Sequence, residues 1–136
     1  QQIVSVAMGQ LGNSGGQKFW SWYGFESRVE WCACFASWCA EQSGMVASGQ
    51  VLKFSSCAVG ASWFQGQGRW KGKGYTPSAG DFIFFDWNKD GQVDHVGIVV
   101  NVANGRVNTI EGNTSNMVAR RSYQLGGIVI VGYGYI

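Results

Sequence analysis

The hydrophobic pattern of this 136-residue chain changes character at Asp81, and the change limits the folds open to it. Before Asp81, apolar residues recur at helical spacing, whereas after it they form short runs typical of strands. These runs cover residues 82–85, 95–102, 106–110 and 127–135. Helices first and strands second predict an α+β fold, in which N-terminal helices pack on a C-terminal antiparallel β-sheet.

Three N-terminal segments fill much of the helical half. Apolar residues from Ile3 to Leu11 recur every three or four positions and stop at Gly12, which predicts a short amphipathic helix. Residues 56–64 favour a second short helix. Residues 19–25 contain too many aromatic rings for a fully solvated segment, so we expect a loop whose rings line a groove or cover part of the core.

A further helix is predicted to begin close to Cys32. Residues 27–30 have the Ser-x-x-Glu form of a capping box, and the apolar spacing that follows continues until Gly44. Cys32 then lies in the first turns, where aligned peptide dipoles stabilise a thiolate and lower the pKa of a thiol. Cys34 is a rival nucleophile, although it and Cys39 are more typical of buried packing residues.

Length and composition narrow the possibilities further. With 46% hydrophobic residues the chain can bury one core, so we predict a single domain over residues 1–136. Nothing in the sequence fixes the oligomeric state, and a monomer is the expectation. Ten basic and eight acidic side chains are scattered without a basic stripe, so nucleic acid is not an expected partner. No apolar run reaches the roughly 20 residues that span a bilayer. The first residues lack the features of a secretion signal, and we expect a domain excised from a longer secreted protein.

Cysteine spacing leaves the redox state open. Four cysteines allow two disulfides, but three are clustered and Cys57 is distant, unlike an evenly spaced disulfide framework. A structural zinc site is disfavoured, because Cys-x-Cys-x₄-Cys with one histidine does not match the usual ligand spacing.

One histidine, His95, is available to activate a thiol. Either Glu111 or Asn113 could accept the imidazole N–H and orient the ring. We rank Glu111 first, because a carboxylate also stabilises the imidazolium through a charge-assisted hydrogen bond. With a backbone N–H at the helix start as oxyanion donor, Cys32 and His95 suggest a cysteine hydrolase.

The hairpin at Asn104-Gly105 can form in two ways. A two-residue type I′ turn would pair Ala103 with Arg106, whereas a three-residue loop with a glycine bulge would pair Val102 with Arg106.

This choice decides whether the site can form. The two-residue turn would set Glu111 opposite Ile98 and away from His95. The three-residue loop would set Glu111 opposite Gly97, and Ile98 against Ile110 on the other face. We therefore predict the three-residue loop, with its glycine in a left-handed conformation.

Residues 86–94 copy much of an EF-hand calcium loop, with oxygen side chains at positions one, three, five and nine and glycine at six. The expected glutamate at position twelve is Gly97, and Asp90-Gly91 also makes an ordinary β-turn. Calcium binding and a plain turn are both open. The candidate metal ligands are Asp86, Asn88, Asp90, Gln92 and Asp94.

Aromatic residues are more numerous than a small core needs. Core packing is the commoner role for any one ring, but some are expected to line a groove that binds sugars or peptides. The candidates are Trp20, Trp22, Tyr23, Trp31, Trp63, Trp70 and Trp87.

Four blocks in this order resemble a CHAP domain (cysteine, histidine-dependent amidohydrolase/peptidase). The blocks are EWCACFASW (30–38), GDFIFFD (80–86), DHVGIV (94–99) and IEGN (110–113). The resemblance covers nearly the whole chain and implies a papain-like α+β fold that cleaves bacterial peptidoglycan.

Carried over by position, the resemblance implies Cys32 as nucleophile, His95 as base, Glu111 as orienting acid and Asn113 as accessory amide. It also places Tyr23 beside the nucleophile.

The resemblance implies a secreted or cell-wall enzyme whose chemistry needs no cofactor. It would cut an amide between muramic acid and L-alanine, or within the stem peptide or cross-bridge, through an acyl-enzyme. Trp22, Tyr23 and Trp31 are the expected substrate-binding residues. Many members have glycine before the histidine, where this chain has Asp94, which favours the ion-loop hypothesis.

Two other functions stay open. The chain could be a non-catalytic, calcium-dependent wall-binding module that keeps the groove without a competent Cys-His pair. It could also be a cytosolic papain-like protease acting on proteins.

Overall fold

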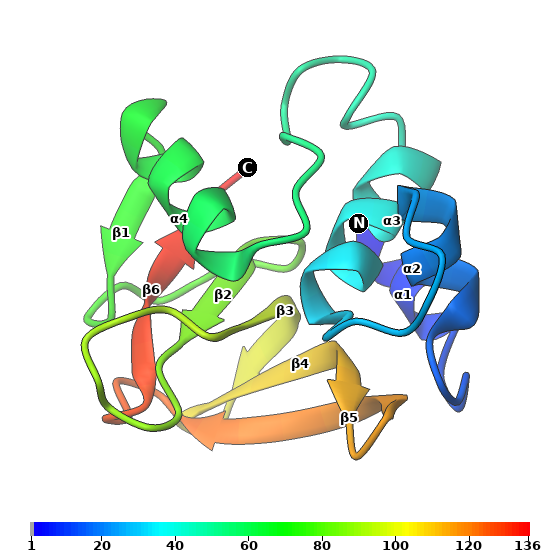
Figure 1. Ribbon diagram of the computed structural model, residues 1–136. Helices are drawn as coiled ribbons and strands as arrows, with labels where there is room; N and C mark the ends of the chain where they lie inside the picture. Colours follow the sequence, from blue (N-terminus) through cyan, green and yellow to red (C-terminus); the bar gives the residue numbers. More distant parts are fainter. Residues whose placement is uncertain (1) are drawn as a thin grey trace.

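The computed structural model describes residues 2–136, which form four α-helices and one six-stranded antiparallel sheet (Figure 1). The helices are α1 (Gln2–Met8), α2 (Gln17–Tyr23), α3 (Cys32–Gln42) and α4 (Cys57–Gly66). The strands are β1 (Trp70–Gly72), β2 (Phe82–Phe85), β3 (His95–Ala103), β4 (Arg106–Thr114), β5 (Met117–Gln124) and β6 (Ile130–Gly134), in the sheet order β1-β6-β2-β3-β4-β5. The predicted α+β fold is confirmed.

The helical half contains one helix more than predicted. The ring-dense segment expected to be a loop forms α2, because its aromatic rings have a core to enter. Phe19 is fully buried, with its ring centroid 5.6 Å from that of Trp31 and 5.0 Å from that of Phe35. α4 forms where a short helix was predicted, and the Ser56 side chain caps it by accepting a hydrogen bond from the Val59 amide.

The predicted capping box is wrong and the helix begins later than that motif implies, although Cys32 still lies in its first turn. α3 begins at Cys32 and its N-cap is Trp31, which makes no side-chain cap. Glu30 instead accepts hydrogen bonds from Arg28 and Asn113, two side chains outside the helix.

Two strands were missed. β1 has only three residues, too few for a pattern to show. β5 is a half-exposed edge strand containing Arg120 and Arg121, and charged residues of this kind are common on exposed strand edges but weaken a strand pattern in the sequence.

The β3–β4 hairpin corrects the predicted loop but keeps the predicted register at the site. Ala103 pairs with Arg106 across a two-residue turn, and Asn104 and Gly105 have φ of 55° and 73°, as a type I′ turn requires. A bulge at Val100 then shifts the pairing by one residue.

Beyond that bulge, Ile98 pairs with Ile110, as predicted. Side chains alternate between the faces of a strand, so Gly97 and Glu111 share the face opposite to this pair. The glycine faces the carboxylate side chain, because a Cβ built at Gly97 would lie 2.6 Å from Glu111 Cγ.

The core has two parts, one on each face of the sheet. On one face, α1 and α3 pack against β3 and β4, and α4 packs against β1 and β6. Phe82, Phe84 and Val96 are among the strand residues buried beneath the helices. The other face buries a smaller cluster that includes Phe85 and Val99.

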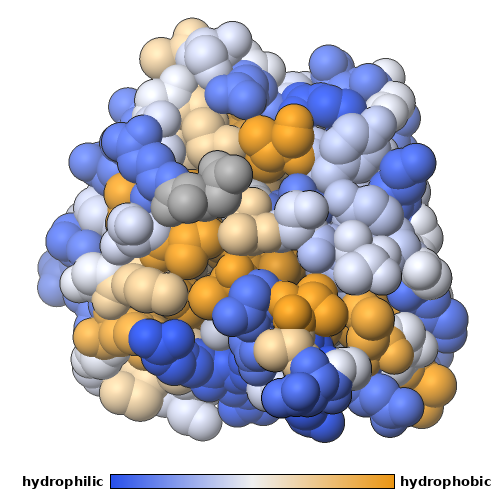
Figure 2. All heavy atoms as spheres, turned by 180° about the vertical axis from the view of Figure 1, so that it is seen from behind, coloured by the Kyte–Doolittle hydropathy of each residue, from blue (hydrophilic) through white to orange (hydrophobic). Residues whose placement is uncertain are grey.

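The surface seen from behind mixes a band of apolar side chains with polar and charged ones (Figure 2). The exposed large hydrophobic residues are Met8, Val59, Trp87, Ile128, Val131 and Ile136. Across residues 2–136, every helix is too short or too polar to span a bilayer.

Candidate active site

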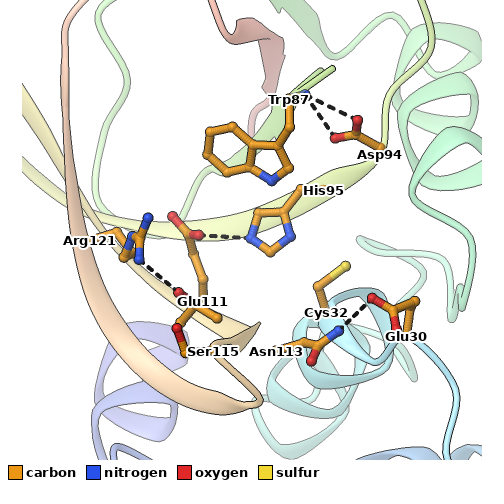
Figure 3. A pocket seen from close by; sticks show the side chains of 10 residues that line it. Glu30, Cys32, Trp87, Asp94, His95, Glu111, Asn113, Ser115 and Arg121 are labelled. Atoms are coloured by element: carbon orange, nitrogen blue, oxygen red, sulfur yellow. Dashed lines mark hydrogen bonds and ion pairs between the residues drawn. The ribbon is translucent and has the colours of Figure 1, made fainter. Parts of the chain in front are cut away.

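Cys32 and His95 line the same pocket, although they come from different halves of the chain (Figure 3). Cys32 is the first residue of α3 and His95 the first residue of β3. The pocket has a volume of about 340 Å³, and its other walls come from the β2–β3 loop, β4, the β4–β5 turn and β5. The fold thus brings the predicted nucleophile and base to one opening.

The Cys32 thiol is buried at the positive end of a helix. Its Sγ lies 3.4 Å from the Sγ of Cys57, and the hydrogen bond between them is the largest influence on its ionisation. That bond, together with the hydrogen bond and positive charge of His95 and the Val96 amide, outweighs the effect of burial. The pKa of Cys32 is lowered to about 5.

The His95 imidazole lies between Cys32 and Glu111 (Figure 3). Its Nε2 is 2.7 Å from Glu111 Oε1, which leaves Nδ1 for the side that faces Cys32. Burial lowers the pKa of His95, but the hydrogen bonds and negative charges of Cys32 and Glu111 raise it more, to about 9. Both shifts favour a thiolate on Cys32 and an imidazolium on His95.

Glu111 is a buried carboxylate that accepts hydrogen bonds from three side chains. Oε1 accepts from His95, and Oε2 accepts from Thr109 Oγ1 and, at 2.7 Å, from the Tyr123 hydroxyl. A buried charge is tolerated only with partners of this kind. Glu111 is thus the residue that holds the imidazole, as ranked from the sequence.

Sequence reasoning missed the two hydroxyls that hold Glu111. Thr109 lies two residues before it on β4 and so shares its face, a relation the strand period contains. Tyr123 could not be found, because β5 was not predicted. Burial and the Glu111 charge raise the pKa of Tyr123, which keeps its hydroxyl a donor.

Trp87, one of the aromatic residues that the sequence offered as lining a groove, is a wall of this pocket. Its ring stacks on Phe85 with centroids 4.7 Å apart and lies 5.4 Å from the His95 ring. At 39% exposure it is the aromatic wall of the pocket that a ligand can reach.

The four cysteines are free thiols in different surroundings. Burial raises the pKa of Cys34 to about 11 and that of Cys39 well above its usual range. Neither is suited to act as a nucleophile, so the rival assignment to Cys34 loses its support. Cys57, which sequence spacing left distant, is the thiol that contacts Cys32.

Comparison with known families decides the relationship. The model of the CHAP domain matches residues 22–113, a span that holds Cys32, His95 and Glu111. This chain belongs to the CHAP domain family. The resemblance drawn from the sequence is confirmed, and comparison with curated proteins gives no significant match.

Solved structures share the fold of this CHAP domain. "The crystal structure of Ly7917" superposes with a TM-score of 0.62 at 18% identity, covering 97% of this chain and 59% of that one. A second structure, of Ly7917 "with the hydrolyzing product of MDP", gives 0.62 at 19% identity, covering 97% and 60%. The chain thus spans about three fifths of the length of these neighbours.

Asn113 lines the pocket of this CHAP domain but does not orient His95. Asn113 has a φ of 60°, in the left-handed region, and its side chain turns to partners other than His95. Its Oδ1 accepts a hydrogen bond of 2.8 Å from Arg28, and its Nδ2 donates one of 3.0 Å to Glu30.

Of the three aromatic residues expected to bind substrate, one lies in the core and two lie half-buried on α2. Trp31 is fully buried against Phe19, so its assignment as a substrate contact is wrong and it is a core residue. Trp22 and Tyr23 are half-buried on α2 beneath Lys53 Nζ, at 4.6 and 4.8 Å from their ring centroids, and lie outside the pocket of Cys32. Their role in binding substrate stays a prediction.

The suggested calcium loop, residues 86–94, directs its oxygens at its own backbone. The Asp86 carboxylate accepts a hydrogen bond of 2.9 Å from the Gly91 amide, and Asp94 accepts one of 3.0 Å from the Trp87 amide. In the described part of the chain, no three His, Cys, Asp or Glu side chains gather closely enough to hold an ion. Calcium binding by this loop stays a prediction.

Proposed function

We propose that this CHAP domain hydrolyses an amide bond of bacterial peptidoglycan through an acyl-enzyme on Cys32. The observation that carries the proposal is that Cys32 and His95 line one polar pocket, with the His95 ring hydrogen-bonded to Glu111. Two comparisons support it: the family is that of cysteine, histidine-dependent amidohydrolases and peptidases, and Ly7917 has been crystallised with the hydrolysing product of MDP, a peptidoglycan fragment.

In the first step the Cys32 thiolate attacks the amide carbon and forms a carbon–sulfur bond. Negative charge develops on the carbonyl oxygen, and backbone N–H groups at the start of α3 stabilise it. The carbon–nitrogen bond then breaks as the imidazolium of His95 donates its proton to the leaving amine. The amine departs, and a thioester remains on Cys32.

In the second step neutral His95 takes a proton from a water molecule, which attacks the thioester carbon. The carbon–sulfur bond breaks, the carboxylic acid leaves, and the thiolate–imidazolium pair is restored. Glu111 takes no proton in either step; it orients the ring and stabilises its positive charge.

The pocket suits a polar, extended substrate. Arg121 and Ser115 lie on one side of it and Trp87 on another, so the walls offer a cation, a hydroxyl and an aromatic ring (Figure 3). Peptide stems attached to sugars carry carboxylates, amides and apolar faces that match these groups. We propose that the protein acts as a monomer on the cell wall, outside the membrane.

Digestion of purified peptidoglycan tests the proposal. The parent should release soluble muropeptides and Cys32→Ala should release none, while mass spectrometry of the products identifies the bond cut. Cys34→Ala is the matched control, because it removes a thiol two residues away on the same helix. Equal release by parent and Cys32→Ala would refute the nucleophile. Binding without release by both would support the wall-binding module, and cleavage of casein with the wall left intact would support a general protease.

Calcium binding by residues 86–94 is a separate prediction that does not depend on the proposed hydrolysis. Calorimetric titration of chelator-treated protein should give heat if residues 86–94 rearrange to bind the ion. No heat at millimolar calcium would reject the loop as a site and leave the proposed chemistry untouched.

A further inference from the structure

Cys32 and Cys57 form a thiol pair built from two helix starts. Each is the first residue of its helix, α3 and α4 respectively, and their Sγ atoms lie 3.4 Å apart. A disulfide needs about 2.05 Å between the sulfurs, so an approach of little more than one ångström would join them. The hydrolysis mechanism uses only one of the two thiols.

The two thiols differ in their access to small molecules. Both are buried, Cys32 at 5% and Cys57 at 9% exposure, but only Cys32 is among the residues that line the pocket. An oxidant entering the pocket therefore meets Cys32 first and finds Cys57 in contact with it. In thiol redox sensors one cysteine reacts with the oxidant and a second, resolving cysteine then forms a disulfide with it. Cys32 and Cys57 are placed to act in these two roles.

Ionisation favours the same order of events. Cys32 is held as a thiolate by Cys57 and His95, whereas the pKa of Cys57 is raised by its bond to Cys32, by burial and by negative charge, including that of Asp94. Thiolates react with peroxides, and neutral thiols do so poorly.

We propose that a peroxide converts Cys32 and Cys57 into a reversible disulfide that switches the enzyme off. The disulfide itself follows from the geometry of the thiol pair; only the loss of hydrolysis rests on the proposed function.

The chemistry balances with hydrogen peroxide as the sole oxidant. The Cys32 thiolate attacks one peroxide oxygen, the O–O bond breaks, and Cys32 sulfenic acid and hydroxide form. The Cys57 sulfur then attacks the Cys32 sulfur, and the sulfenic oxygen leaves as water with the Cys57 proton. The two thiols lose two electrons, and the peroxide is reduced. A dithiol such as dithiothreitol returns both electrons and restores the thiolate.

Oxidation followed by peptide mapping tests the proposal. Reduced protein is treated with a few equivalents of hydrogen peroxide, alkylated under denaturing conditions and digested without reduction. Trypsin should place Cys57 in residues 54–69, and Cys32 with Cys34 and Cys39 in residues 29–53. Fragmentation between Cys32 and Cys34 then assigns the link. We expect a Cys32–Cys57 link, at least a tenfold loss of wall hydrolysis, and recovery of both with dithiothreitol.

Two variants provide the controls. Cys57→Ser keeps a hydroxyl donor beside Cys32 but cannot form a disulfide, so peroxide should carry Cys32 on to sulfinic acid and dithiothreitol should restore nothing. Cys34→Ser should give the same link as the parent. Cys32 sulfinic acid in the oxidised parent, without a link to Cys57, would overturn the proposal. A link formed by a protein that never cleaves wall would uphold the thiol pair and overturn the proposed hydrolysis.

Discussion

Cys32 and Cys34 lie two residues apart on α3 and have opposite chemistry. Cys32 stands at the helix start beside His95 and Cys57, in the wall of a pocket, and its pKa is lowered to about 5. Cys34 points into the core, where burial raises its pKa to about 11. The two residues are of the same type and share most of their sequence neighbours, so the difference in pKa comes from the groups that each sulfur faces.

The comparison shows how little of the reactivity lies in the cysteine itself. Cys32 and Cys34 lie within one helical turn but point in different directions. Cys32 faces the His95 imidazole, whereas Cys34 faces apolar side chains. Cys39, one turn and a half further along, is also fully buried and its pKa is also raised. The nucleophile is therefore made by β3 and α4, which bring His95 and Cys57 to the helix start.

The largest expected effect is the loss of Cys32. Cys32→Ala should lower the rate of wall hydrolysis by about 10⁴-fold or more, because no other thiol can form the acyl-enzyme. Cys34→Ala should keep the rate within a few-fold while costing about 1–2 kcal/mol of unfolding free energy from the cavity it leaves. Initial rates and denaturant unfolding of both variants check this. Loss of activity in a folded Cys34→Ala variant, with Cys32→Ala active, would reverse the assignment.

Replacing Glu111 by glutamine should have the next largest effect. The amide can still contact His95, but it no longer stabilises the imidazolium by charge, and we expect the rate to fall about 10³-fold. The pKa of His95 should fall too, so the alkaline limb of the pH–rate profile should move to lower pH. A profile unchanged in Glu111→Gln would show that another group holds the ring.

Tyr123→Phe removes one donor to Glu111 and should have a smaller effect. A single hydrogen bond is worth about 1 kcal/mol, so the rate should fall roughly five-fold. Since Thr109 and His95 still hold the carboxylate, the protein should stay folded, as circular dichroism can check. A loss as large as that of Glu111→Gln would mean that Tyr123 touches the reacting groups itself.

The sequence predicted those features that depend on neighbouring residues and on strand period. Cys32 at a helix start and Glu111 on one face with Gly97 follow from such patterns. The predicted hairpin loop was wrong because the amino-acid sequence gives no sign of the bulge at Val100. That bulge restores the strand register that the site needs. Asn113, ranked below Glu111, contacts Arg28 and Glu30 and not His95, and its role as an accessory amide stays a prediction.

Features that depend on distant elements could not be read from the chain. Cys57 meets Cys32 only because α4 and α3 point their first residues at one place. Tyr123 reaches Glu111 from an edge strand whose pattern is too polar to recognise. Trp31 is an aromatic residue of the kind that often binds ligands, but it is buried against Phe19 of α2, a helix where the sequence predicted a loop.

The pH dependence of Cys32 alkylation tests the central claim most directly. Iodoacetamide reacts with the thiolate, and peptide mass spectrometry can follow Cys32 separately from Cys34. A thiolate paired with imidazolium predicts that the Cys32 rate rises with a midpoint near pH 5 and is already high at pH 6, where Cys34 stays unlabelled. A midpoint near pH 8.5, that of an ordinary thiol, would contradict the ion pair and the mechanism built on it.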